Sequence, residues 1–177
     1  MEAEEATMDF KSKIREIPNF PKEGILFYDI TTLLKDAESF HRVIEKLADF
    51  YRDEGIQKVV AIESRGFILG APLAYLLKAG FVPVRKTGKL PSEVYEVQYN
   101  LEYGTNTLAI HKDAITLGER VLVVDDLLAT GGTVSATVDL TRKLGGAIVG
   151  IAFLVELQEL RGRDKLKGYP VLSLINY

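Results

Sequence analysis

The 177-residue sequence contains no cysteine and no tryptophan, and it has only two histidines, His41 and His111. Without cysteine there is no disulfide bond, no thiolate metal site and no cysteine nucleophile. Two histidines are too few for a histidine-rich metal centre. The lack of cysteine also fits a reducing compartment.

Long apolar runs and an excess of positive charge are missing as well. No apolar segment approaches the ~18–20 residues that span a bilayer. The acidic amino end (MEAEEATMDF) lacks the basic-then-apolar order of a signal peptide. The net charge of −3 argues against broad electrostatic binding of nucleic acid. We therefore expect a cytoplasmic protein that binds neither nucleic acid nor membranes.

Apolar strand-like segments alternate with helix-like ones along the chain. Strands are predicted at Lys58–Ile62, Phe81–Val84, Leu108–His111, Arg120–Val124 and Ile148–Val155. Helices are predicted after an N-cap at Asp36, over Gly66–Ala79 up to a stop at Gly80, and from Val134 to Leu144. The alternation indicates an α/β fold with a mostly parallel twisted sheet flanked by helices.

The amino-terminal part has a different character. A first short helix is expected over Phe10–Ile17, and Ile17–Leu34 is rich in turn formers and large apolar groups. Pro18, Pro21 and Gly24 prevent a regular helix in that segment. We interpret residues 10–34 as a small hood over a surface or pocket, with an arm packed on the core as the open alternative. No linker divides the chain, so we expect a single domain over residues 1–177.

One stretch organises the chain: VLVVDDLLATGGT, from Val121 to Thr133. It predicts a buried strand, then Asp125 and Asp126, then a glycine loop that leads into a helix. Ligands of open α/β sheets bind outside the carboxyl ends of strands, and N–H groups of a glycine loop at a helix N-terminus suit a phosphate. The motif thus indicates a ligand with a phosphate and sugar hydroxyls. A strand–turn–helix junction with steric glycines and capping acids is the plain alternative.

These thirteen residues resemble the phosphoribosyl-diphosphate-binding motif of type I phosphoribosyltransferases. The resemblance implies that Asp125 and Asp126 hold the ribose hydroxyls and face the positive charge that develops on the ring. It implies that the 5-phosphate is bound by Ala129, Thr130, Gly131, Gly132 and Thr133. Other phosphate-binding signatures, G-x-x-x-x-G-K-[ST] and G-x-G-x-x-G, do not occur in the sequence.

A second motif, Glu63-Ser64-Arg65-Gly66, follows the first predicted strand and is expected at the same sheet edge. Arg65 offers a planar guanidinium suited to a diphosphate, although a surface salt bridge is the alternative. The segment ESRGF resembles the diphosphate loop of adenine phosphoribosyltransferases. This implies that Ser64 and Arg65 contact the diphosphate, that Arg65 takes part in catalysis, and that a non-proline cis peptide lies within Glu63–Arg65.

The third motif, RKTGKLP at Arg85–Pro91, opens a long connection without clear secondary structure. A connection of about 20 residues is uncommon unless it functions as a lid. Its cations Arg85, Lys86 and Lys89 form either a solvated face or a diphosphate site.

RKxGKLP and LEYG (Leu101–Gly104) are similar to the flexible loop of adenine phosphoribosyltransferases. The resemblance implies a lid over residues 85–107, contacts from the three cations to the diphosphate, and a catalytic role for Glu102. A solvent-exposed loop acid is the alternative for Glu102.

The last motif, FPKEGILFYDIT, resembles the adenine-pocket segment of the same family. It implies that Phe27 stacks on the base and that Leu26 and Tyr28 supply backbone contacts. Leu157, in VELQEL after the last long predicted strand, matches a position that borders the base in relatives. Glu23 departs from the family, in which a proline commonly precedes the glycine.

Four blocks in order, from about Ile14 to Tyr177, thus match one family. The resemblance implies purine salvage, in which the 5-phosphoribosyl group passes from 5-phospho-α-D-ribose 1-diphosphate to adenine, giving AMP and diphosphate. It also implies a homodimer and Mg²⁺ held mainly by substrate and water rather than directly by the protein. Two alternatives stay open: a non-catalytic sensor of the sugar diphosphate, and a transferase for xanthine, hypoxanthine or orotate.

Overall fold

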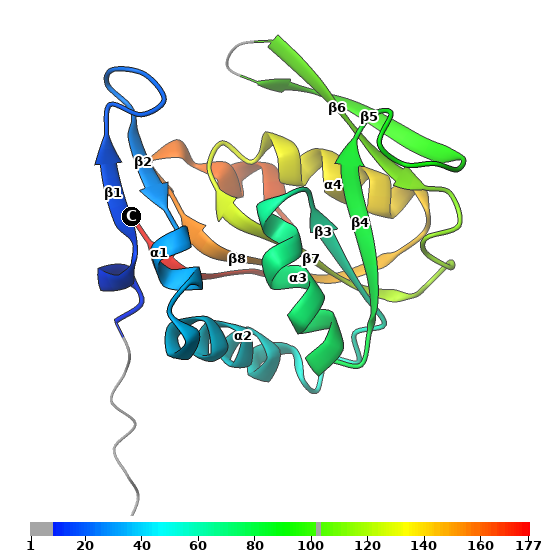
Figure 1. The fold of residues 1–177 in the computed structure, drawn as a ribbon. Coiled ribbons are helices and arrows are strands. Elements are labelled where there is room, and N and C mark those ends of the chain that lie inside the picture. Colours follow the sequence, from blue (N-terminus) through cyan, green and yellow to red (C-terminus); the bar gives the residue numbers. More distant parts are fainter. Residues whose placement is uncertain (1–8, 102–103) are drawn as a thin grey trace, which may run out of the picture. The chain divides into compact units, whose positions relative to one another are not determined.

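The computed structural model describes residues 9–101 and 104–177, and the chain divides into two compact units, residues 1–45 and 46–177. The larger unit holds the main sheet (Figure 1). None of the helices in the described part of the chain is long and apolar enough to cross a membrane.

The first unit contains a two-stranded antiparallel sheet of β1 (Arg15–Pro18) and β2 (Leu26–Asp29). The short 3₁₀ helix η1 (Lys11–Lys13) precedes it, and α1 (Thr31–Leu34) follows. The helix expected over Phe10–Ile17 is therefore wrong beyond one turn. The backbone becomes extended at Ile14 (φ −94°, ψ 134°), and the next residues pair with β2.

Helix α2 (Ala37–Tyr51) begins at the predicted N-cap. Asp36 Oδ1 accepts the backbone N–H of Ser39 at 2.9 Å, which supplies a partner for a donor that the helix itself leaves open. The side chain of Ser39 donates to the same oxygen.

The second unit is built on a seven-stranded sheet in the order β5-β6-β4-β3-β7-β8-β9. Five neighbouring strands, β4-β3-β7-β8-β9, are parallel, and β6 and β5 form an antiparallel hairpin at one edge. The strands are β3 (Lys58–Ile62), β4 (Gly80–Lys86), β5 (Val94–Leu101), β6 (Gly104–His111), β7 (Arg120–Leu128), β8 (Ala147–Glu156) and β9 (Val171–Asn176). The mostly parallel sheet is thus confirmed.

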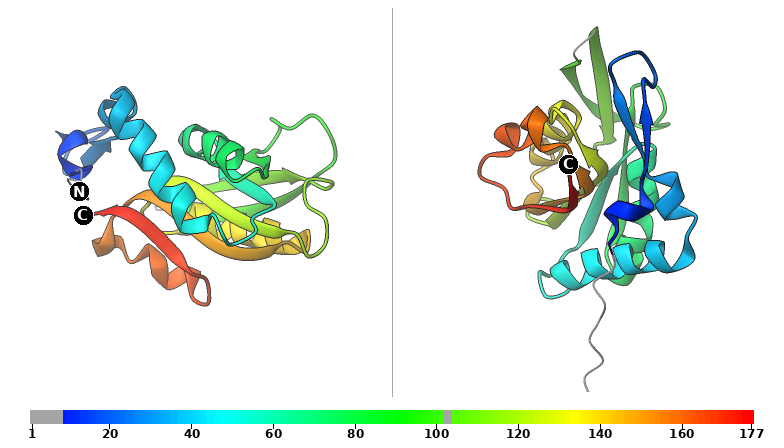
Figure 2. Two further views of the ribbon diagram at one scale, coloured as in Figure 1. Left: turned by 90° about the horizontal axis from the view of Figure 1, so that it is seen from below. Right: turned by 90° about the vertical axis from the view of Figure 1, so that its left-hand side faces the viewer.

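Helices α3 (Arg65–Leu76) and α4 (Gly132–Lys143) cover opposite faces of this sheet, as Figure 2 shows from below. Close packing of α3 depends on Gly70, where a Cβ would lie 2.6 Å from the Cβ of Ala61 on β3. Two 3₁₀ helices, η2 (Gln158–Leu160) and η3 (Gly162–Leu166), connect β8 to β9. The core between the layers is aliphatic, as the continuous apolar runs of the central strands predict.

Two sequence predictions are wrong in this unit. The residues 94–107, expected to lack regular structure, belong largely to the β5–β6 hairpin. Helix α3 does not run to Gly80. It ends at Leu76, Lys78 turns left-handed (φ 55°), and the N–H of Ala79 donates to the carbonyl of Ala74 at 2.9 Å. Gly80 is instead the first residue of β4.

The strand order reverses direction between β3 and β7, a place that we call the β3–β7 switch point. Strand β3 continues in the chain toward β4 on one side, whereas β7 leads to β8 on the other side. Pairing of β7 with β3 stops at Val124, but pairing with β8 continues to Leu128. The residues from Asp125 onward therefore lie beyond the end of β3, at the kind of switch point where ligands of such sheets bind.

Candidate active site

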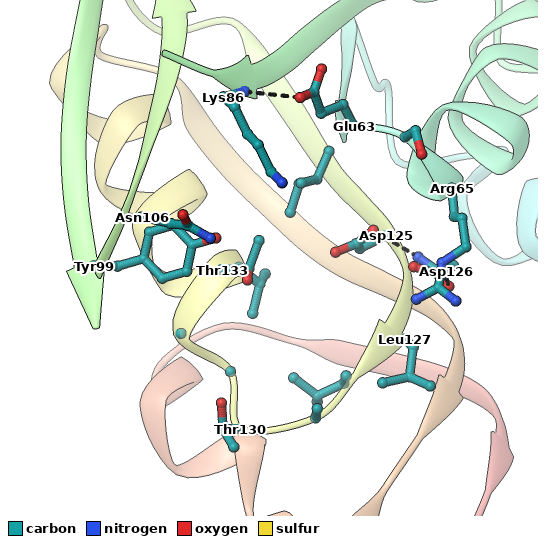
Figure 3. A pocket seen from close by; sticks show the side chains of 17 residues that line it. Glu63, Arg65, Lys86, Tyr99, Asn106, Asp125, Asp126, Leu127, Thr130 and Thr133 are labelled. Atoms are coloured by element: carbon teal, nitrogen blue, oxygen red, sulfur yellow. Dashed lines mark hydrogen bonds and ion pairs between the residues drawn. The ribbon is translucent and has the colours of Figure 1, made fainter. Parts of the chain in front are cut away.

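A cavity of about 310 Å³ lies at the β3–β7 switch point (Figure 3). Segments far apart in the sequence line it: the ends of β3 and β4, the β5–β6 hairpin, β7 and the start of α4. The lining residues are Ile62, Glu63, Ser64, Arg65, Lys86, Tyr99, Asn106, Asp125, Asp126, Leu127, Leu128, Ala129, Thr130, Gly131, Gly132, Thr133 and Val134.

The predicted acidic pair lies at the centre of this set. Asp126 is only 4 % exposed, and its Oδ2 lies 2.9 Å from Nε of Arg65. Oδ1 of Asp125 accepts the backbone N–H of Asp126 at 2.9 Å. Burial raises the pKa of Asp125 well above its ordinary value, and the neighbouring charge of Asp126 raises it further. Burial also raises the pKa of Asp126, against the opposing effect of Arg65.

The turn after β3 brings Arg65 to the acids. The peptide bond between Glu63 and Ser64 is cis, as the resemblance implies. Gly66, in the first turn of α3, lies directly beside β7, where a Cβ would lie 2.8 Å from Oδ1 of Asp125. The lack of a side chain at Gly66 thus lets α3 pack closely against Asp125. A larger residue would displace the carboxylate.

The glycine loop, residues 129–133, leads into α4. Gly131 is its N-cap residue in the left-handed conformation (φ 77°, ψ 3°), which glycine adopts at no steric cost. Helix N-termini leave backbone N–H groups without helical partners. Together with the hydroxyls of Thr130 and Thr133, which line the same cavity, these groups can bind an anion.

Lys86 reaches the cavity from the end of β4, and two residues opposite it were not predicted. Tyr99 on β5 and Asn106 on β6 are a directly opposed cross-strand pair, and both line the cavity. Figure 3 shows the side chains of Lys86, Tyr99 and Asn106 pointing into it. The alternation of Tyr95, Val97 and Tyr99 with polar residues is the sequence signal for this strand, but the pairing of Tyr99 with Asn106 depends on the hairpin register.

The three cations of the third motif do not act as one group. Only Lys86 lines the cavity, whereas Arg85 and Lys89 bind the carboxylate of Glu63. Nε of Arg85 lies 2.7 Å from Oε2, and Nζ of Lys89 lies 3.2 Å from Oε1. Burial raises the pKa of Glu63, but hydrogen bonds from Arg85, from the N–H of Lys86 and from Lys89 outweigh this effect and lower it. Glu63 therefore stays charged.

The predicted adenine contacts lie outside the cavity lining. Leu157 is half-buried after β8, and its N–H donates to the carbonyl of Leu128 at 2.9 Å. Leu26, Phe27 and Tyr28 form β2 of the first unit, where the ring of Phe27 lies 5.1 Å from that of Phe20. Glu102 lies outside the described residues.

Within the described residues, no group of three or more His, Cys, Asp or Glu side chains is placed to hold a metal ion. Three carboxylates line the cavity, but Glu63 is bound by Arg85 and Lys89, which leaves the adjacent Asp125 and Asp126 on the β7 side. This donor set fits a cation that takes most of its ligands from a bound substrate and from water.

Comparison with known proteins identifies the family. The phosphoribosyl transferase domain matches residues 30–175. An adenine phosphoribosyltransferase of Solibacter usitatus is 59 % identical over 169 residues, covering 96 % of this chain and 98 % of the relative. The crystal structure of the enzyme from Thermoanaerobacter pseudethanolicus superimposes with a TM-score of 0.92 at 55 % identity, covering 95 % and 98 % of the two chains.

A third relative carries ligands. The adenine phosphoribosyltransferase of Saccharomyces cerevisiae, complexed with D-2,5-dideoxy-2,5-imino-altritol 1,6-bisphosphate and adenine, is 40 % identical with a TM-score of 0.88. The match covers 93 % of this chain and 96 % of the yeast chain. By sequence over nearly its full length and by fold, the chain belongs to the adenine phosphoribosyltransferase family.

Proposed function

We propose that this protein transfers the 5-phosphoribosyl group from 5-phospho-α-D-ribose 1-diphosphate to adenine, giving AMP and diphosphate. The observation that carries the proposal is the cavity in which a glycine loop at a helix N-terminus, a buried acidic pair and Arg65 meet. The family supports the choice of substrates, since the yeast relative binds adenine together with an iminosugar bisphosphate.

The sugar phosphate fits the β7 side of the cavity. In our proposal the 5-phosphate accepts hydrogen bonds from the N–H groups and hydroxyls of residues 129–133, and Asp125 and Asp126 bind the ribose 2- and 3-hydroxyls. Positive charge builds on the ring as the bond from C1 to the diphosphate oxygen breaks. The two carboxylates stabilise that charge, which is an electrostatic contribution made in the transition state.

The leaving diphosphate is proposed to lie toward β3 and β4, against Ser64, Arg65 and Lys86. Arg85 and Lys89, which bind Glu63 next to this site, add positive charge near the diphosphate. Bound Mg²⁺ supplies further neutralisation of the diphosphate charge, with substrate oxygens and water as its main ligands. Arginine at this point can contact two phosphate oxygens at once.

The base and the proton transfer are assigned by resemblance to the family. We propose that Phe27 stacks on adenine and that Leu26 and Tyr28 contact it through their backbones. Leu157 borders the base, and Glu102 assists at the reacting centre. In the same proposal, residues 1–177 act as one catalytic domain, with residues 10–34 as its hood and residues 85–107 as its lid. Closure of a lid excludes water and holds the reactants in place.

We also propose a cytoplasmic homodimer. A multiply charged sugar diphosphate does not cross a bilayer, so its consumer works in the compartment that makes it. The dimer is supported by apolar side chains exposed on α3 and β4, which we call the α3 patch: Ile68, Tyr75, Leu76 and Phe81.

The activity is tested by supplying adenine, hypoxanthine, xanthine or orotate in turn with Mg²⁺ and the sugar diphosphate, and by measuring diphosphate release. We expect release with adenine and AMP as the product. The double variant Asp125→Asn/Asp126→Asn should lose about 10²–10³-fold in kcat. Release with another base alone, or no release with any base, would refute the proposal.

A further inference from the structure

The segment after β8 contacts the glycine loop through Gly162, although no sequence motif indicates a role for it. A Cβ on Gly131 would lie 2.5 Å from the carbonyl oxygen of Gly162, and a Cβ on Gly162 would lie 2.3 Å from the carbonyl oxygen of Ala129. Real Cβ atoms essentially never come this close to other atoms, so the two backbones touch with no side chain between them. The peptide of Gly162 thus forms the back wall of the loop.

Arg163 anchors this wall to the sheet. Its Nε and one terminal nitrogen donate to the two oxygens of Glu156, each at 2.6 Å. Its other terminal nitrogen donates to the carbonyl of Val171 at 3.0 Å, and Oγ of Ser173 donates to Glu156 at 2.7 Å. A bidentate arginine–carboxylate pair fixes both distance and plane. The start of η3 is therefore held to β8 and β9 together.

Glu156 connects this pair to the loop through the strands as well. It lies opposite Leu128 in the β7–β8 register, and Leu128 directly precedes the loop. Glu156 is only 4 % exposed. Hydrogen bonding from Arg163 lowers its pKa despite its burial, so the carboxylate stays charged. The strand register in front of the loop and the position of Gly162 behind it thus both depend on one ion pair, in which Glu156 is buried and Arg163 is partly exposed.

We propose that Arg163 is a positioning residue for 5-phosphate binding. By holding Gly162 against Ala129 and Gly131, it keeps the loop N–H groups in the arrangement that binds the phosphate. Arg163 does not line the cavity, so it acts only through the loop. Groups that are already ordered bind more tightly because less conformational freedom is lost on binding. This inference rests on the proposed function of the loop.

The proposal predicts a selective defect. Ribose 5-phosphate, AMP and the sugar diphosphate all carry the 5-phosphate, whereas adenine does not. Loss of the anchor should weaken the first three ligands and spare the base. General destabilisation would not make this distinction.

The decisive comparison is between Arg163→Met and Lys165→Met. The first removes the guanidinium but keeps an apolar stem, and the second makes the same charge change at an exposed position of η3. Titration with ribose 5-phosphate, followed by ³¹P NMR, should show affinity about tenfold weaker in Arg163→Met, the lower end of the ~10–100-fold loss caused by removing the supporting partner of a metal ligand. KM for the sugar diphosphate should rise in parallel, with KM for adenine within about twofold of wild type. Lys165→Met should match wild type.

Unchanged affinity for ribose 5-phosphate in folded Arg163→Met, or an equal rise in both KM values, would overturn the inference. If Arg163→Met does not fold, Arg163→Lys decides by the same criteria, since an ammonium cannot make the bidentate contact. The variant Thr133→Val tests the proposed phosphate site itself, independently of the role of Arg163. If it binds ribose 5-phosphate as wild type does, the loop is not the phosphate site and the proposed function itself is wrong.

Discussion

Asp125 and Asp126 occupy a site that favours chemistry over stability. Adjacent carboxylates repel each other, and burial raises the pKa of both. Arg65 lowers the pKa of Asp126, but it is partly exposed and is shared with the proposed diphosphate site. Sites that stabilise developing positive charge must keep negative charge concentrated, and this concentration destabilises the free protein.

Replacement of Asp125 by asparagine should therefore raise stability while it lowers activity. We expect Tm at pH 7.5 to increase by about 2–4 °C, which corresponds to ~1 kcal/mol in a chain of this size. Thermal unfolding monitored by circular dichroism measures this change. The same protein sample should show at least about a hundredfold lower kcat.

The stability gain of Asp125→Asn should depend on pH in a direction that follows from the raised pKa of Asp125. A carboxyl group whose pKa is raised in the folded state contributes stability at low pH, and this contribution is lost as the pH rises through the folded pKa. The gain from Asp125→Asn should accordingly be present at neutral pH and shrink toward about pH 4, near the ordinary aspartate pKa. A gain that grows on acidification, or a net loss of stability at neutral pH, would show that Asp125 is not destabilised by burial.

Individual residues also show what the sequence can and cannot predict. Lys86 and Arg85 are adjacent cations, and successive residues of a strand point to opposite sides. The motif identifies both as phosphate-binding candidates, but it does not reveal that Glu63, twenty-two positions earlier in the chain, binds Arg85. Such pairing depends on which strands become neighbours, which a local pattern does not encode.

At the scale of elements, the end of α3 offers a stability test. Lys78 is the left-handed residue of this C-terminus, and a side chain in that conformation costs about 1 kcal/mol relative to glycine. Lys78→Gly should raise Tm by about 2–4 °C in thermal melts.

Lys78→Ala is the matched control for that prediction, because it removes the long side chain and keeps the Cβ. It should leave Tm close to that of wild type. If the alanine variant gains as much as the glycine variant, the lysine side chain and not the backbone conformation is responsible.

The β5–β6 hairpin shows why one element escaped prediction. Its Tyr95, Val97 and Tyr99 alternate with polar residues and pack against the core, which is the period-two pattern of a half-buried strand. The ring of Tyr95 also lies 4.4 Å from Nζ of Lys143 on α4. The signal was present in the sequence, but polar residues and the basic motif before it favoured a loop. The contact of Gly162 with Gly131 has no such signal, since it joins residues thirty-one positions apart.

At the scale of the whole molecule, the α3 patch should mediate dimer formation. Tyr75 is 83 % exposed, the highest value in this patch, and exposed apolar patches mark protein–protein interaction sites. We expect wild type to elute with twice the 19.7 kDa mass of one chain in size-exclusion chromatography with light scattering. Tyr75→Lys should shift the mass toward the monomer.

Leu117→Lys provides the control for this shift. Leu117 is 84 % exposed, but it lies on the connection between β6 and β7 and outside the α3 patch. It should leave the mass unchanged. A monomeric wild type, or the same shift in both variants, would remove the α3 patch as the interface.

In our proposal, one cavity at the β3–β7 switch point binds the sugar phosphate between the glycine loop and the acidic pair. A crystal structure of the protein with AMP would show where the nucleotide binds. We predict the phosphate within hydrogen-bond distance of the N–H groups of residues 131–133, and the ribose hydroxyls on Asp125 and Asp126. A nucleotide bound elsewhere, or one with its phosphate on Arg65 and Lys86 instead of the loop, would contradict the account.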